Sequence, residues 1–145
     1  MKNVYVDTSV LLRVVLNEPG QLPEWAELAA PVVSVLAEVE GLRTIERATH
    51  QMTHPRRKPL REAEANAARV RLYAMLEMFA RIELAPAILR RAGQLNGPLG
   101  TLDALHLATA LAWSEGVGKS LIMATHDTAL GKAAAAHGLK AIGLF

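Results

Sequence analysis

The chain has 145 residues, of which 51% are hydrophobic, and its formal net charge is only +2. This size allows one domain with its own core, so we expect a single domain over residues 1–145. The absence of cysteine excludes disulfide frameworks and thiolate metal sites, and it favours a reducing compartment such as the cytoplasm. The small net charge is weak evidence for a polyanionic partner.

Apolar runs divide the chain into alternating strands and helices. We expect strands at residues 3–6, 31–34, 81–84, 120–124 and 139–142, with helical segments between them. Residues 59–79 are rich in Ala, Arg, Glu, Leu and Met, and they predict one long helix that packs against a helix over residues 34–50. This alternation favours an α/β fold in which helices flank a parallel central sheet, as in a Rossmann-like sandwich. Functional residues of such sheets collect beyond the carboxyl ends of the strands.

The three aspartates stand out against eleven glutamates because each lies in apolar surroundings. Asp7 interrupts the run VYVDTSVLL just after the first strand, Asp127 follows the fourth strand, and Asp103 opens the apolar helix TLDALHLATALAW. Each could simply cap a helix, since aspartate accepts hydrogen bonds from the first helical N–H groups. Two of the three nevertheless mark strand ends, so we expect the aspartates to converge at one edge of the sheet.

Converging carboxylates repel one another unless protons or divalent cations neutralise them. Hard oxygen ligands select Mg²⁺ or Mn²⁺ rather than zinc, so the pattern indicates a magnesium or manganese site. The helix VSVLAEVEGLRTIER offers Glu38, Glu40 and Glu46 as a further ligand. Its periodicity does not choose between them, and each could instead be a surface glutamate in an i, i+3 or i, i+4 pair.

Four segments resemble, in order, the four acidic motifs of the PIN domain family, and the VapC-type toxins in particular. They are VDTSVLL, SVLAEVEGLR, TLDALHLATAL and ATHDTAL, which begin at residues 6, 34, 101 and 124. The resemblance implies metal-dependent cleavage of RNA by an endoribonuclease of a toxin–antitoxin pair. The acids that it implies as catalytic residues and as Mg²⁺ or Mn²⁺ ligands are Asp7, Glu40, Asp103 and Asp127.

The resemblance selects Glu40 over Glu38, because the family spacing Ser-x-Leu-x-x-x-Glu-x-x-Arg begins at Ser34. It also implies that small hydroxyl residues beside the acids support them, namely Thr8, Ser9 and Thr125. A small antitoxin protein is the implied partner, with its tail over the acidic site. We further expect a homodimer, since residues 59–79 carry more apolar and small residues than one buried helix face needs.

The densest basic segment is HPRRKPLR, at residues 54–61. We expect it to grip the RNA backbone through Arg56, Arg57, Lys58 and Arg61, although a solvated connector between two helices would have the same composition.

Three other functions fit parts of the sequence. His106 and His126 could act as acid and base on RNA without a metal, leaving 2′,3′-cyclic phosphate ends, although a histidine on an apolar helix is more often a core residue. The fold could bind RNA or a protein without catalysis, but all four acids are present. A DNA-directed 5′-nuclease is a further possibility, for which 145 residues leave little room for DNA-gripping elements.

Overall fold

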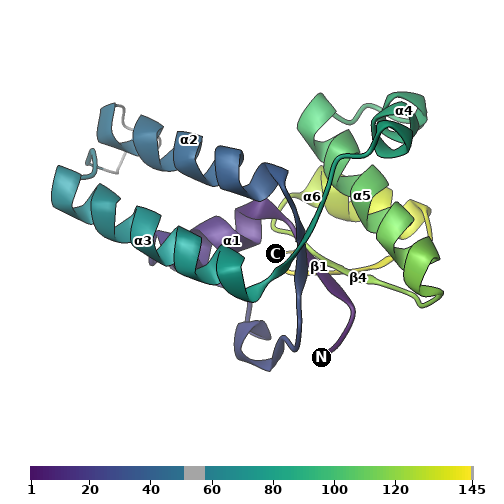
Figure 1. Ribbon diagram of the computed structural model, residues 1–145, viewed down its shortest axis with the longest axis horizontal. Coiled ribbons are helices and arrows are strands. Elements are labelled where there is room, and N and C mark those ends of the chain that lie inside the picture. Colours follow the sequence, from purple (N-terminus) through teal and green to yellow (C-terminus); the bar gives the residue numbers. More distant parts are fainter. Residues whose placement is uncertain (51–57, 145) are drawn as a thin grey trace.

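The computed structural model describes residues 1–50 and 58–144, and its centre is a five-stranded sheet (Figure 1). All four strand pairs are parallel, which confirms the predicted α/β class. Every predicted strand is found, but each is only three residues long. Across the sheet the strands are β3 (Ala80–Ile82), β2 (Val32–Ser34), β1 (Val4–Val6), β4 (Ile122–Ala124) and β5 (Lys140–Ile142).

Helices fill most of the chain between the strands. They are α1 (Thr8–Val15), the short 3-10 helix η1 (Trp25–Glu27), α2 (Leu36–His50), α3 (Glu62–Met78), α4 (Pro86–Gln94), α5 (Thr101–Val117) and α6 (Thr128–Ala136). The predicted pair of long helices is present, since α2 and α3 lie side by side (Figure 1). Within the described ranges, no helix is both long and apolar enough to cross a membrane.

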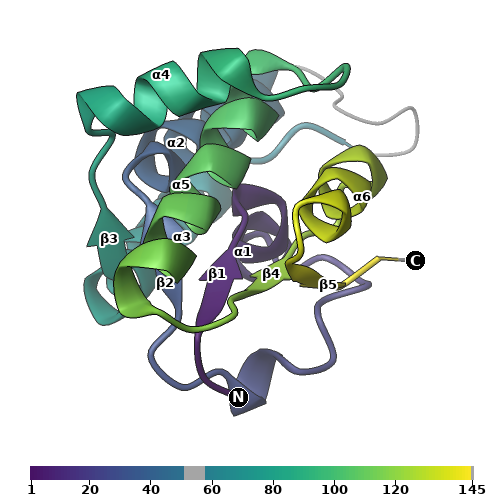
Figure 2. The ribbon, with the colours of Figure 1, turned by 90° about the vertical axis from the view of Figure 1, so that its right-hand side faces the viewer.

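The two faces of the sheet carry separate apolar cores, because side chains along a strand alternate between faces. Val4 and Val6 of β1 point into a core shared with α1, α2 and α3. Tyr5, between them, points into a second core formed with α5 and α6. Figure 1 shows these two helical layers on the left and right of the sheet, and Figure 2 looks onto the second layer.

The strand order reverses between β1 and β4, which are neighbours in the sheet although far apart in the chain. Their last residues, Val6 and Ala124, are register partners, and the N–H of Asp7 donates to the carbonyl of Ala124 over 2.9 Å. The segments that follow these two strands therefore leave the sheet side by side. This is the switch point at which parallel α/β sheets place their sites.

Candidate active site

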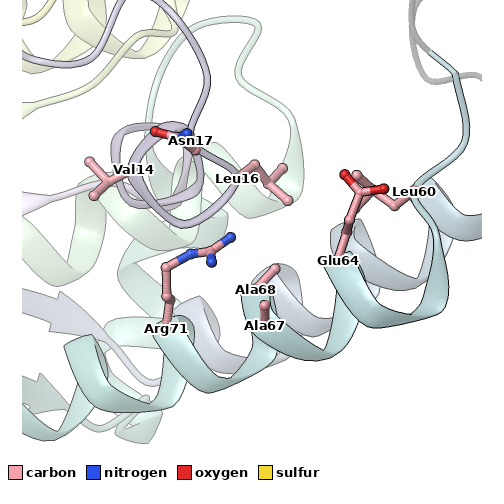
Figure 3. A pocket seen from close by; sticks show the side chains of 8 residues that line it. All are labelled: Val14, Leu16, Asn17, Leu60, Glu64, Ala67, Ala68 and Arg71. Atoms are coloured by element: carbon pink, nitrogen blue, oxygen red, sulfur yellow. The ribbon is translucent and has the colours of Figure 1, made fainter.

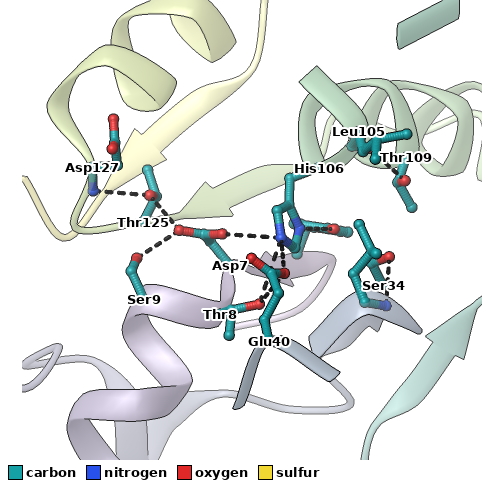
Figure 4. Close-up of polar contacts among 12 residues, drawn as sticks. Asp7, Thr8, Ser9, Ser34, Glu40, Leu105, His106, Thr109, Thr125 and Asp127 are labelled. Atoms are coloured by element: carbon teal, nitrogen blue, oxygen red, sulfur yellow. Dashed lines mark hydrogen bonds and ion pairs between the residues drawn. The ribbon is translucent and has the colours of Figure 1, made fainter. Parts of the chain in front are cut away.

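Asp7 is buried at the carboxyl end of β1, and hydroxyl groups hold its carboxylate. The residue occupies the N-cap position of α1, yet its side chain caps no helix N–H. Instead, Oδ2 accepts hydrogen bonds from Ser9 Oγ over 2.6 Å and from Thr125 Oγ1 over 2.9 Å (Figure 4). Helix capping therefore does not account for Asp7, and two of the three hydroxyls expected beside the acids contact it directly.

Glu40, on α2, lies beside Asp7 and turns toward the same site (Figure 4). Its Oε1 accepts hydrogen bonds from Thr8 Oγ1 over 2.9 Å and from His106 Nε2 over 2.6 Å. The side chain of Glu38 makes no hydrogen bond with the described residues, and the side chain of Glu46 pairs with His50 and Arg69 toward the far end of the helix. Helical periodicity did not choose between the three glutamates as a further metal ligand. Only Glu40 shares a neighbour with Asp7, because His106 Nε2 contacts both carboxylates.

Asp127 and Asp103 complete the group from the other layer of helices. Asp127 caps α6, since its Oδ1 accepts from the N–H of Leu130 over 2.8 Å. Its own N–H donates to Thr125 Oγ1 over 3.0 Å, so one threonine hydroxyl links Asp127 to Asp7. Asp103 lies in the first turn of α5. Burial, followed by the charges of Asp127 and Asp7, raises the pKa of Asp103, with a smaller contribution from Glu40.

Two further residues reach this site: Tyr5, which the sequence did not single out, and His106, which it offered only as a metal-independent catalyst or a core residue. His106 is almost fully buried on α5, with Nε2 at 2.6 Å from Glu40 and 3.6 Å from Asp7 Oδ1. Its Nδ1 lies 2.7 Å from the hydroxyl of Tyr5, which is fully buried on β1. Burial lowers the pKa of His106, but the hydrogen bond to Glu40 and the charge of Asp7 outweigh it, so the pKa lies above its ordinary value. The sequence carried one signal that His106 belongs to the site: its i, i+3 spacing from Asp103 places both side chains on one face of α5.

The donor set fits a hard divalent cation, because it consists of carboxylate oxygens. One carboxylate oxygen accepts hydrogen bonds from the protein in each of Asp7, Glu40 and Asp127. The second oxygen of each, and both oxygens of Asp103, accept no hydrogen bond from the described residues. Among those residues, no group of three or more His, Asp or Glu side chains is arranged as a ready metal site. The chemistry of the donors therefore fits Mg²⁺ or Mn²⁺, whereas their arrangement alone does not define a coordination shell.

The basic segment lies partly outside the described residues, which do not include Arg56 and Arg57. Lys58 is exposed. Arg61, also exposed, forms an ion pair with Glu64 over 2.9 Å at the start of α3. Of the two basic residues that can be placed, Arg61 thus already has a carboxylate partner.

A pocket of about 530 Å³ lies between α1 and α3 and contains none of the four acids (Figure 3). Apolar side chains such as Leu16 and Leu60 line it together with the charged Glu64 and Arg71. Arg71 Nε donates to the carbonyl of Val15 over 2.8 Å, which ties α3 to the end of α1. The pocket is therefore a surface feature separate from the acidic group.

The fold and the acidic group define a class: an α/β protein with carboxylates gathered at the switch point of a parallel sheet. The PIN domain family model matches residues 4–136, so the chain belongs to the PIN domain family. This confirms the family named from the four motifs. No curated protein matches the chain significantly.

Solved structures with the same fold include a chain of a toxin-antitoxin complex and chains of two protein–DNA complexes. A toxin-antitoxin complex from Klebsiella pneumoniae contains a chain with a TM-score of 0.63 and 17% identity, covering 88% of this chain and 89% of that one. VapBC2 from Rickettsia felis, bound to a DNA fragment from its promoter, gives a TM-score of 0.64 at 11% identity and covers 97% of both chains. FitAB bound to an IR36 DNA fragment gives a TM-score of 0.63 at 17% identity, and the match covers 98% of this chain and 94% of that one. At these identities the likeness shows a shared fold.

Proposed function

We propose that the chain is a metal-dependent endoribonuclease of the VapC type, the toxin of a toxin–antitoxin pair. The observation that carries this proposal is the gathering of acids at the switch point, where Asp7 and Asp127 share the Thr125 hydroxyl and Asp7 and Glu40 share His106 (Figure 4). Burial, and then the charges of Asp127 and Asp7, raises the pKa of Asp103. Membership of the PIN domain family supports it, as does the shared fold with chains from a toxin-antitoxin complex, from VapBC2 and from FitAB.

In the proposed mechanism Asp7, Glu40, Asp103 and Asp127 would hold Mg²⁺ or Mn²⁺. The cation would lower the pKa of a water molecule and neutralise charge at the phosphodiester, giving 5′-phosphate and 3′-hydroxyl ends. The chain's own residues prepare the ligands: Ser9 and Thr125 fix Oδ2 of Asp7, and Thr8 and His106 fix Oε1 of Glu40. The remaining oxygens are left available for the cation.

A metal-independent route through His106 and His126 has less support. His106 is only 1% exposed, and both of its ring nitrogens lie within hydrogen-bond distance of protein groups. An acid or base must reach the proton that it transfers, and a ring enclosed in this way does not reach RNA. We therefore assign the histidine to the support of the acids rather than to contact with substrate.

The same proposal includes an antitoxin partner and a homodimer. The face of α3 formed by Ala65, Ala68, Leu72 and Leu76 is buried. The helix also exposes large apolar side chains elsewhere, at Val70, Tyr73 and Met78. These exposed residues support the expectation that a further surface of this helix is covered by another protein.

The test compares Glu40→Gln with Glu38→Gln, two identical changes two residues apart on α2. Glu40→Gln should lower cleavage of RNA about 100-fold or more and weaken Mn²⁺ binding in calorimetry, because a neutral amide is a poor ligand for a hard cation. Glu38→Gln should behave like the unmodified protein in both assays.

Chelation supplies the second arm of the test. Cleavage should stop when EDTA is added and return with excess Mg²⁺, and the products should carry 5′-phosphate ends. Cleavage that persists in EDTA and leaves 2′,3′-cyclic phosphate would refute the metal mechanism. Equal losses from the two glutamine variants would show that Glu40 has no special role.

A further inference from the structure

A chain of hydrogen bonds runs from the core of the second helical layer into the acidic group. The Tyr5 hydroxyl lies 2.7 Å from His106 Nδ1, and His106 Nε2 lies 2.6 Å from Glu40 Oε1. The Tyr5 and His106 rings also meet edge to face, with centroids 5.9 Å apart and an angle of 71° between their planes. Both side chains are buried, so the ring of His106 is held at both nitrogens and by packing.

The chemistry of the partners decides where one proton lies. An ionised carboxylate only accepts hydrogen bonds, so Nε2 of His106 must carry the proton in its contact with Glu40. The Tyr5 hydroxyl can donate to Nδ1 or accept from it, and it fixes the ring in either case.

This arrangement acts on the two carboxylates unequally. Nε2 lies 2.6 Å from Glu40 Oε1 but 3.6 Å from Asp7 Oδ1, so the N–H donates to Glu40 and lies against Asp7. The donor therefore fixes Glu40 Oε1 and places a positive dipole beside the Asp7 carboxylate, which would otherwise repel Glu40. In Figure 4, dashed lines join the His106 ring to both acids.

Ordinary core packing does not explain this placement. The buried polar residue one turn further along α5, Thr109, satisfies its hydroxyl with the carbonyl of Leu105 over 2.6 Å, within its own helix. His106 instead bonds side chains on β1 and α2, elements that the chain brings to it from far away. Removing carboxylates from water costs free energy, and a histidine needed only for packing would not require two of them as neighbours.

We propose that Tyr5 and His106 are positioning residues of the acidic site: Tyr5 fixes the imidazole, and the imidazole N–H fixes Glu40 beside Asp7 so that both acids can share a cation. The consequence for metal binding rests on the proposed function. The hydrogen-bonded arrangement itself does not rest on the proposed function, and it can be measured without metal or substrate.

The test uses Tyr5→Phe and His106→Asn, with Thr109→Val as the matched control on the same helix. Tyr5→Phe keeps the ring packing and removes only the hydroxyl. Groups that orient ligands typically change metal affinity or activity about 10–100-fold. We expect each variant to weaken Mn²⁺ binding in calorimetry by about that factor and to lower kcat. KM for RNA should stay constant, because His106 is 1% exposed and does not touch substrate.

A double-mutant cycle separates positioning from structural damage. In a Glu40→Gln background, Tyr5→Phe should have little further effect on Mn²⁺ affinity or kcat, since the ligand it acts through is already changed. A purely structural role would give additive losses. Wild-type Mn²⁺ affinity and kcat in Tyr5→Phe, or additive losses in the cycle, would overturn the proposal even if His106→Asn fails to fold.

A metal-free measurement distinguishes this proposal from the proposed function. In ¹⁵N NMR of the metal-free protein, Glu40→Gln should shift His106 Nε2, Tyr5→Phe should shift Nδ1, and Thr109→Val should shift neither. If the unmodified protein binds no Mn²⁺ and cuts no RNA, the proposed function fails, and the NMR shifts alone decide whether His106 positions Glu40. Unchanged Nε2 and Nδ1 shifts would overturn the positioning role.

Discussion

Thr125→Val is expected to destabilise the protein because one hydroxyl serves two polar groups at the site. Thr125 is fully buried, donates to Asp7 Oδ2 over 2.9 Å and accepts from the N–H of Asp127 over 3.0 Å. A hydrogen bond to a charged group contributes about 1.5–3 kcal/mol, and a buried donor left without a partner costs about 1–3 kcal/mol. Ser9 still donates to Asp7 in the variant, and the N–H of Asp127 is only partly buried, so the lower ends of both ranges apply. Together they give about 2.5 kcal/mol.

Urea denaturation measures this loss directly. With a slope of about 2 kcal/mol per molar urea, the unfolding midpoint of Thr125→Val should fall by about 1.2 M. Thr125→Ser is the control, because it keeps the hydroxyl and removes only a buried methyl group, at a cost of about 1 kcal/mol. A valine variant as stable as the serine variant would refute the reasoning, since it would show that the hydroxyl contributes nothing beyond packing.

Three further predictions concern the acid, the basic segment and the oligomer. Asp7→Asn should abolish RNA cleavage while the melting temperature stays within a few degrees or rises, because it removes a ligand and also relieves carboxylate repulsion; full activity would contradict the assignment. Replacing Arg56, Arg57 and Lys58 by alanine in that inactive background should weaken RNA binding and flatten its log-log salt dependence by about 0.7 per lost contact, and an unchanged slope would show that the segment does not touch RNA. Light scattering at micromolar concentration should show a dimer that Val70→Glu converts to a monomer, whereas an unmodified monomer would count against the exposed α3 residues as an interface.

The fold could be predicted because its signals are local. Each apolar run that predicts a strand overlaps a strand of the sheet, and the long segment after residue 59 is the helix α3. Strand ends were less predictable, as for the run at 81–84, which overlaps β3 (Ala80–Ile82) by only two residues. A strand ends where its neighbours stop pairing, and that depends on partners far away in the sequence.

The acidic site could be predicted in part for a similar reason. Asp7 and Asp127 follow strands, and the rule that parallel strands end at one edge is enough to bring them together. Whether Glu38 or Glu40 faces the site depends on how α2 is rotated about its axis. Helical periodicity does not fix that rotation, and the family spacing was needed to select Glu40. The role of His106 was not predicted, because a histidine on an apolar helix gives the same pattern whether its partner is a backbone carbonyl or a carboxylate from another element.

The groups that contact the Asp7 carboxylate also bear on function. Its close partners are the hydroxyls of Ser9 and Thr125 and the N–H of His106. Across the described residues, no lysine or arginine forms an ion pair with any of the four acids. A guanidinium or ammonium would cancel the charge permanently and compete with a cation, whereas hydroxyl dipoles fix the carboxylate oxygens and leave the charge in place. Burial is the main cause of the raised pKa of Asp103, and the charges of Asp127 and Asp7 add to it, as expected where negative charge remains. Such a site attracts and orients a divalent cation more effectively than one already neutralised by the protein.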